Sequence, residues 1–297
     1  RVTAAHYDAA LRRWRIRTDR GDTVLATHCV MASGCLSLPR KPDFPGLDTF
    51  KGRWFHTGQW PREAVDFTGH RVGVIGTGSS GIQCIPLIAQ QARHLAVFQR
   101  TAPYSIPARN APMDPEHERR LKARYADYRR EARGTPSGVV RDKVVAASVF
   151  DLPAQERTQI FHRFWSKGGT GFTRAFGDVT QSLEANAEAA EFVRGRIRAT
   201  VQDPRAAALL ASQDYPIGTK RLCLDTGYYE TFNRANVTLV DVRTSPIEQI
   251  TPTGLRTGGT EYPLDSIVFA TGYDAITGAL TSIDLRGRNG LALADKW

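Results

Sequence analysis

The clearest chemical signal in the sequence is a glycine-rich turn between a predicted strand and a predicted helix. The strand, residues 71–75, leads into Gly76, Gly78 and Gly81 with the spacing G-x-G-x-x-G, and a helix of about residues 80–92 follows. In such a turn the first glycine bends the chain, the second lets the backbone approach a pyrophosphate, and the third allows close helix–strand packing. The N–H groups at the helix N-terminus then favour an anion. The sequence therefore predicts a dinucleotide-binding site.

The end of the next predicted strand indicates which dinucleotide would bind. After residues 94–99 the chain has Arg100 and Thr101, and no acidic residue. An Asp or Glu at this place would bind the ribose 2′-hydroxyl of NAD, whereas Arg can form charged hydrogen bonds to the 2′-phosphate of NADP. This favours NADP.

A second spaced pattern lies before the turn. From its chemistry alone, His56 would be a packed or hydrogen-bonded structural histidine. The pattern F-x-G-x-x-x-H-x-x-x-W-P is matched by Phe50, Gly52, His56, Trp60 and Pro61. It resembles the fingerprint of type I Baeyer–Villiger monooxygenases, in the flavin-containing monooxygenase superfamily.

The resemblance, closest to the phenylacetone and cyclohexanone monooxygenases, covers essentially the whole chain. Further segments typical of these enzymes are residues 31–37, 99–112, 215–221, 228–234 and 265–274. Ser33, where relatives often have Thr, and Tyr273, where many have Phe, are small departures.

The resemblance implies a role for each matching residue. The NADP pyrophosphate would be held by the turn residues Gly76, Thr77, Gly78, Ser79, Ser80, Gly81, Ile82 and Gln83. The 2′-phosphate would be held by Arg100, Thr101 and Lys220. Arg221 would be the active-site arginine that reaches the flavin, Val2 would lie beside the FAD adenine, and His56 would serve structure and domain coupling.

The activity that the resemblance implies is an NADPH- and O2-dependent oxidation, with FAD as the second cofactor, that converts ketones to esters or lactones. Alternatives are a flavin monooxygenase that oxygenates sulfur or nitrogen, an NADP-dependent disulfide or quinone reductase, and a non-catalytic NADP-binding module. A disulfide reductase would need a redox pair of cysteines at C-x-x-C or C-x4-C spacing, which the sequence lacks.

The predicted fold class is α/β: a Rossmann-like NADP-binding domain with a large helical insertion, plus partial strands of an FAD-binding domain. The expected parts are FAD-domain strands in 1–35, the NADP domain in 36–106 and 215–264, the helical insertion in 107–214, and a partial FAD domain in 265–297. The FAD-binding G-x-G-x-x-G and the C-terminal segment of these enzymes do not occur in the sequence. We therefore expect a central fragment that is inactive by itself.

Hydrophobic patterns predict the elements around these motifs. A strand of residues 11–18 and a second from residue 23 form a hairpin, with no partner strand visible upstream. Helical stripes are predicted at Leu121, Tyr125 and Tyr128, at Phe161, Phe164 and Trp165, and at Leu183, Ala187, Ala190, Val193 and Ile197.

The composition and charge indicate the class of ligand, the state of the cysteines and the location of the protein. The 297 residues have a net charge of +10, but the basic residues are dispersed, and pairs such as Arg119 with Arg120 read as solvated helix faces, so an anionic small ligand is favoured over nucleic acid. The four cysteines lack zinc or redox spacing and are expected to be reduced and mostly buried. With no signal peptide and no membrane-length apolar stretch, we expect a cytoplasmic monomer without metal or membrane contacts, acting on a small ketone and O2.

Overall fold

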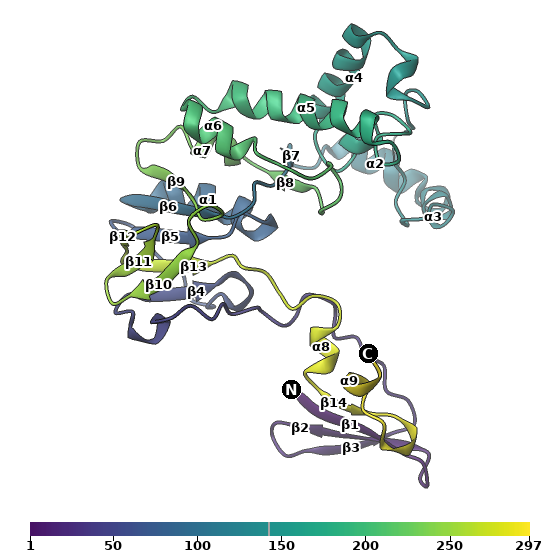
Figure 1. Ribbon diagram of the computed structural model, residues 1–297. Coiled ribbons are helices and arrows are strands. Elements are labelled where there is room, and N and C mark those ends of the chain that lie inside the picture. Colours follow the sequence, from purple (N-terminus) through teal and green to yellow (C-terminus); the bar gives the residue numbers. More distant parts are fainter. Residues whose placement is uncertain (142) are drawn as a thin grey trace. The chain divides into compact units, whose positions relative to one another are not determined.

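The computed structural model describes residues 1–141 and 143–297, which form two compact units (Figure 1). Unit 1 comprises Arg1–Asp43, Phe55–Ala64 and Thr271–Trp297, and unit 2 comprises Phe44–Trp54 and Val65–Ala270. The chain therefore passes between the units four times. The five-part division predicted from the sequence stays a prediction, because compactness does not assign a cofactor to a domain.

The centre of unit 2 is a five-stranded sheet in the order β4-β13-β5-β6-β9. The strands are β4 (Arg53–His56), β13 (Ser266–Phe269), β5 (Arg71–Ile75), β6 (His94–Gln99) and β9 (Val237–Asp241). The last four run parallel. The chain goes from β5 to β6 on one side, and β13 returns on the other side of β5. In open α/β sheets a ligand binds at such a switch point, beyond the carboxyl ends of the strands.

Helix α1 (Ser79–Gln91) connects β5 to β6 and buries one apolar face. Its side chains Ile82 and Ile85 are fully buried. The three-stranded antiparallel sheet of β10 (Ile247–Thr251), β11 (Gly254–Thr257) and β12 (Thr260–Pro263) was not predicted. Its residues share an apolar core with side chains of the main sheet, including Phe98 and Phe269. The α/β fold class, with a parallel sheet and crossover helix, is confirmed.

Residues 107–214 are mainly helical, as predicted. The helices are α2 (Pro115–Ala123), α3 (Tyr125–Arg133), α4 (Ala154–Lys167), α5 (Leu183–Thr200) and α6 (Pro204–Leu210). Two shorter elements follow them in the chain, strand β8 (Cys223–Asp225), which pairs with β7 (Ser105–Pro107), and helix α7 (Tyr228–Thr231).

The aromatic stripe of α4 is buried as predicted, and Phe161 packs against Phe172 and Phe176. The stripe predicted on α5 is partly wrong. Leu183 is 72% exposed because it stands at the first position of the helix, directly after the Ser182 cap. Ala187 is also exposed, and Ala185, Asn186 and Ala189 are buried instead.

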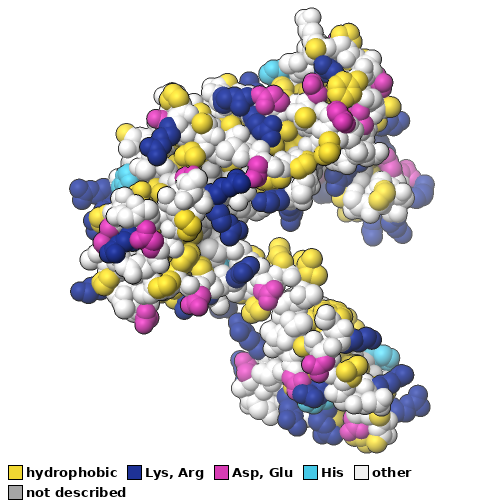
Figure 2. Space-filling view, viewed as in Figure 1, with side chains coloured by type: hydrophobic (Ala, Val, Ile, Leu, Met, Phe, Trp, Pro, Cys, Tyr) yellow, Lys and Arg dark blue, Asp and Glu magenta, His cyan; other side chains and the backbone are white. Residues whose placement is uncertain are grey.

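The stripe predicted on α2 and α3 is wrong as a core. None of Leu121, Tyr125 and Tyr128 is buried, because α2 ends at Ala123 and a new helix begins at Tyr125, which breaks the helical period. The arginine pairs on these helices are solvated, as predicted, and Arg120 pairs with Glu116 one turn away. On the face shown in Figure 2, Lys and Arg side chains are dispersed, with acidic side chains among them.

Unit 1 contains the sheet β14-β1-β2-β3. Its strands are β1 (Val2–Asp8), β2 (Arg13–Thr18), β3 (Thr23–Ala26) and β14 (Asp284–Arg286), and the short helices α8 (Gly278–Thr281) and α9 (Leu293–Lys296) flank β14 in the chain. The prediction that the hairpin lacks an upstream partner is wrong, because β1 pairs antiparallel with β2 and parallel with β14. Residues 2–8 show no regular alternation of apolar and polar side chains, so the sequence pattern does not indicate this strand.

The four cysteines are free thiols, as expected, but they are not mostly buried. Cys223 is buried, Cys29 and Cys84 are half-buried, and Cys35 is exposed, because it lies in an irregular segment rather than in the core. The helices in residues 1–141 and 143–297 are all too short or too polar to span a membrane. Within the same residues no three His, Cys, Asp or Glu side chains are grouped as a metal ion would require.

Candidate functional site

The glycine-rich turn has the backbone geometry that its spacing predicts. Gly76 has φ +103°, a conformation that side chains of L-residues rarely adopt, and its N–H donates to the carbonyl of Phe98 at 3.1 Å. A Cβ at Gly81 would collide with the carbonyl oxygen of Gly76, whereas a Cβ at Gly78 would meet nothing within 4 Å. The first and third glycines are thus required by the fold, and the second leaves open space where a ligand could approach.

The N-terminus of α1 presents its first N–H groups at this open space. Gly78 precedes the helix in an extended conformation, and no side-chain hydrogen bond caps the N-terminus. Uncapped N–H groups together with the helix dipole suit a phosphate. The Thr77 hydroxyl donates to the carbonyl of Thr101 at 3.0 Å and so ties the turn to the end of β6.

The structure separates the predicted turn residues into two groups. Gly78, Ser79 and Gln83 are exposed, and Ser80 is half-buried. Thr77 and Ile82 are buried, and the Ile82 side chain is part of the core. Buried members could therefore reach a pyrophosphate only through the backbone.

Two of the predicted 2′-phosphate residues lie where the chain leaves β6. Arg100 is exposed, and Thr101 is half-buried and joined to Thr77. No ion pair holds Arg100 in the part of the chain that the structure describes, so its charge is available to an anion.

Lys220 comes to the same region from a distant part of the chain. Its ammonium lies 4.4 Å from the centre of the Tyr215 ring. The Tyr215 hydroxyl donates to the carbonyl of Ala102 at 3.0 Å. Tyr215 has no role predicted from the sequence, although it lies in one of the segments that carry the resemblance.

Arg221 precedes β8 and is exposed, without an ion pair among the described residues. The sulfur of Cys223, in the same segment, lies 3.3 Å from the Ser79 hydroxyl. Burial raises the pKa of this thiol, so it remains protonated near neutral pH. The structure therefore brings the segment that carries Lys220 and Arg221 to the first turn of α1.

His56 occupies a buried, fully hydrogen-bonded position in unit 1. Its Nδ1 accepts from the N–H of Gly58 at 3.0 Å, so the ring proton is on Nε2, which lies 3.2 Å from the Thr271 hydroxyl. That hydroxyl donates to the carbonyl of Arg40 at 2.9 Å. Burial lowers the pKa of His56 and keeps it neutral. These contacts are those of a structural residue that holds three segments of unit 1 together.

The other residues of the fingerprint are divided between the units. In unit 2, Phe50 is buried and Gly52 packs so closely on the backbone of Asp265 that a side chain would not fit. In unit 1, Trp60 is exposed, but its ring packs against the ring of Phe55 at a tilt, with 5.4 Å between the ring centres. Pro61 directly follows it.

Comparisons with known proteins agree with this geometry. Residues 13–118, which include the fingerprint and the glycine-rich turn, match the family described as flavin-binding monooxygenase-like. All of this chain aligns at 41% identity with the 2-oxo-Δ3-4,5,5-trimethylcyclopentenylacetyl-CoA monooxygenase of Pseudomonas putida, and covers 56% of it. The chain is thus similar to flavin-binding monooxygenases over its whole length.

Two further comparisons show how much of each relative the chain covers. All of the chain aligns at 40% identity with the cyclohexanone 1,2-monooxygenase of an Acinetobacter species and covers 54% of it. A solved structure titled as an oxidized steroid monooxygenase bound to NADP matches all of the chain with a TM-score of 0.94 and 48% identity, and 57% of that structure is covered. The chain thus spans little more than half the length of these flavin-binding monooxygenase relatives.

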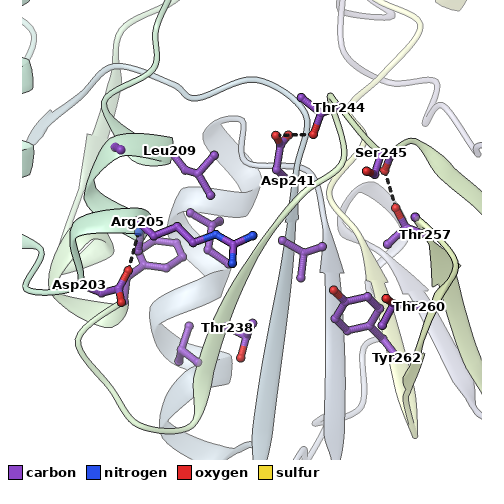
Figure 3. A pocket seen from close by; sticks show the side chains of 17 residues that line it. Asp203, Arg205, Leu209, Thr238, Asp241, Thr244, Ser245, Thr257, Thr260 and Tyr262 are labelled. Atoms are coloured by element: carbon purple, nitrogen blue, oxygen red, sulfur yellow. Dashed lines mark hydrogen bonds between the residues drawn. The ribbon is translucent and has the colours of Figure 1, made fainter.

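Two further places in the chain are not part of the glycine-rich turn. Val2, predicted to lie beside an adenine, is 40% exposed on β1 in unit 1. In unit 2, a groove of about 660 Å³ follows the edge strand β9, and the Arg205 side chain points into it (Figure 3). None of the predicted site residues lines this groove.

Proposed function

We propose that this chain is the NADP-binding core of a flavin monooxygenase that converts ketones to esters or lactones. The single observation that carries the proposal is the convergence, within unit 2, of the uncapped N-terminus of α1 with Arg100 and Lys220. A pyrophosphate at the turn and a 2′-phosphate at the two cations would place a whole NADP molecule across the carboxyl ends of the parallel strands.

The residues present fit NADP. Gly78 leaves room for phosphate oxygens, and Gln83 is exposed one turn further along α1. Arg100 and Thr101 would hold the 2′-phosphate, with Lys220 as the second cation. Since no acidic side chain occupies the end of β6, NAD lacks its usual ribose contact here.

FAD would be the second cofactor and would supply the chemistry that activates O2. In residues 1–141 and 143–297, one glycine-rich turn joins a parallel strand to a helix, and NADP would occupy it. We therefore assign to unit 1 only a flanking role toward FAD, through Val2, and expect the FAD pyrophosphate site in a region that the relatives have beyond the aligned half.

Arg221 would act on the substrate side of the reaction. The overall change is ketone + O2 + NADPH + H⁺ to ester + NADP⁺ + H2O. Negative charge develops on the carbonyl oxygen when an oxygen atom is added to the ketone carbon. A guanidinium stabilises such charge without giving up its proton, because it remains charged at all ordinary pH values.

The test is NADPH consumption by the whole protein, measured with and without O2 and with a panel of cyclic and linear ketones. We expect ketone-dependent consumption and one ester or lactone per NADPH. Oxygenation of sulfides or amines, with no ketone product, would favour the sulfur- or nitrogen-oxygenating alternative. Nucleotide binding without any oxidation by the flavin-loaded protein would contradict the proposed activity.

A further inference from the structure

Lys220 makes a close cation–ring contact with Tyr215. The ammonium lies 4.4 Å from the ring centre, well inside the 6 Å within which such contacts stabilise a cation. Lysine otherwise has a flexible four-carbon stem and loses much rotamer freedom when it is ordered by a ligand. The ring therefore orders Lys220 before any ligand arrives.

Tyr215 is itself fixed on two sides. Its hydroxyl donates to the carbonyl of Ala102 at 3.0 Å, and its ring packs edge-on against Tyr104 at 5.4 Å. The Tyr104 hydroxyl accepts from Arg194 at 2.8 Å, so this neighbour is also held. Burial raises the pKa of Tyr215 to about 12, so its hydroxyl keeps the proton that it donates.

The acidic residue that precedes Tyr215 has its ion pair with a residue other than Lys220. Asp214 directly precedes Tyr215, but its carboxylate pairs with Arg243 at 2.6 Å. Among the described residues, no ion pair joins Lys220 to a carboxylate. Lys220 is thus ordered by a ring and interacts with the Asp214 carboxylate through space without forming an ion pair with it. The hydroxyl of that ring is hydrogen-bonded to Ala102, the residue that follows Arg100 and Thr101.

We propose that Tyr215 is a positioning residue that determines the preference for NADP over NAD, by holding Lys220 where it and Arg100 reach the same 2′-phosphate. This inference rests on the proposed NADP-binding function and adds a residue to it. NAD has a hydroxyl in place of that phosphate, so Tyr215 contributes little to NAD binding.

The experiment measures the dissociation constants of NADP⁺ and NAD⁺ for the whole protein, since the oxidised nucleotides leave bound flavin unreduced. We expect Tyr215→Leu to weaken NADP⁺ binding about two- to fivefold, the size of a cation–π contact at an exposed site. NAD⁺ binding should change less than about twofold. In Lys220→Ala the same tyrosine substitution should have no further effect on NADP⁺, because the two residues act as one unit.

Tyr125→Leu is the matched control, since Tyr125 lies under Arg129 at 5.8 Å on α3. It should change neither constant. If Tyr215→Leu fails to fold by circular dichroism, Tyr215→Phe decides: the ring remains but its bond to Ala102 is lost, so the preference should fall at least about twofold.

The outcomes separate this inference from the function on which it rests. If the unsubstituted protein binds both nucleotides equally, the NADP assignment fails and this inference falls with it. If it prefers NADP⁺, and the preference persists in Tyr215→Leu or, where that variant does not fold, in Tyr215→Phe, only the role of Tyr215 is overturned. An equal effect of Tyr215→Leu with and without Lys220 would also overturn it.

Discussion

The side-chain oxygen of Ser79 lies 3.3 Å from the sulfur of Cys223, which joins the first turn of α1 to strand β8. Strand β8 is in turn paired with β7, just beyond Arg100 and Thr101 in the chain. This contact holds the segment that contains Lys220 and Arg221 beside the glycine-rich turn. The predictions below follow from that convergence and from the packing beneath it.

The first prediction separates the two glycines of the turn. Gly81→Ala should lower the free energy of unfolding by about 1–3 kcal/mol, because its Cβ would collide with the backbone of Gly76. Gly78→Ala should leave stability unchanged, since φ is −76° and the space is open, yet weaken NADP⁺ binding by filling the ligand's place. Urea denaturation and nucleotide titration of both variants check this. Equal stability losses would contradict the assignment.

The second prediction concerns Arg100. Its replacement by Ala should weaken NADP⁺ binding about ten- to hundredfold, which corresponds to the loss of one charged hydrogen bond of roughly 1.5–3 kcal/mol. NAD⁺ binding should be unaffected, because it lacks the 2′-phosphate. Arg119→Ala, an exposed arginine on α2, serves as the control for net charge. Titration calorimetry at constant ionic strength measures the affinity of each variant for NADP⁺ and NAD⁺. An unchanged NADP⁺ affinity in Arg100→Ala would remove this residue from the site.

The third prediction distinguishes Arg221 from its neighbour Lys220 in the whole protein. Arg221→Ala should still bind NADPH, while ester formation falls by about two to three decades, the usual effect of removing a charge that stabilises developing negative charge. Oxygen that is consumed should then appear as H2O2. Lys220→Ala should mainly raise KM for NADPH. Product analysis with peroxide detection checks this, and an Arg221→Ala rate within about threefold of the parent would exclude a catalytic role.

The fourth prediction concerns the ion pair between Arg71 and Asp265, which joins the starts of β5 and β13. The guanidinium donates from Nε at 3.0 Å and from Nη2 at 2.6 Å, and the pKa of Asp265 is lowered to about 2. Because the folded pKa lies below the unfolded value of about 3.9, this stabilisation is present above about pH 4 and is lost as the pH falls toward 2.

Arg71→Gln should therefore lower the free energy of unfolding at neutral pH, by about 1 kcal/mol or less because both side chains are half-exposed. The difference from the parent should shrink between pH 4 and pH 2. Urea denaturation across this range measures it, with Arg120→Gln in the exposed pair with Glu116 as the control. A difference that stays constant with pH would show that packing, not charge, is responsible.

Local features of this protein could be predicted from the sequence because their causes lie within a few residues. Strand β5, the turn and α1 follow from an apolar run, three spaced glycines and a helical period, and the structure has each of them. The fingerprint around His56 carried the family resemblance in the same way. By contrast, the predicted burial of Leu183 is wrong, because its exposure depends on where the helix begins relative to the core.

Which residues come together at the site depends on the tertiary structure. That Arg100, Lys220 and Arg221 are cations in segments typical of an NADP site follows from the sequence alone. Only the fold shows that the Tyr215 ring holds Lys220, that the Tyr215 hydroxyl donates to Ala102, and that Cys223 contacts Ser79. Tyr215 and Ala102 are 113 residues apart and Cys223 and Ser79 are 144 apart, and both contacts depend on strand order and on the pairing of β7 with β8. No local propensity encodes such contacts, since each residue would have the same local conformation without its partner.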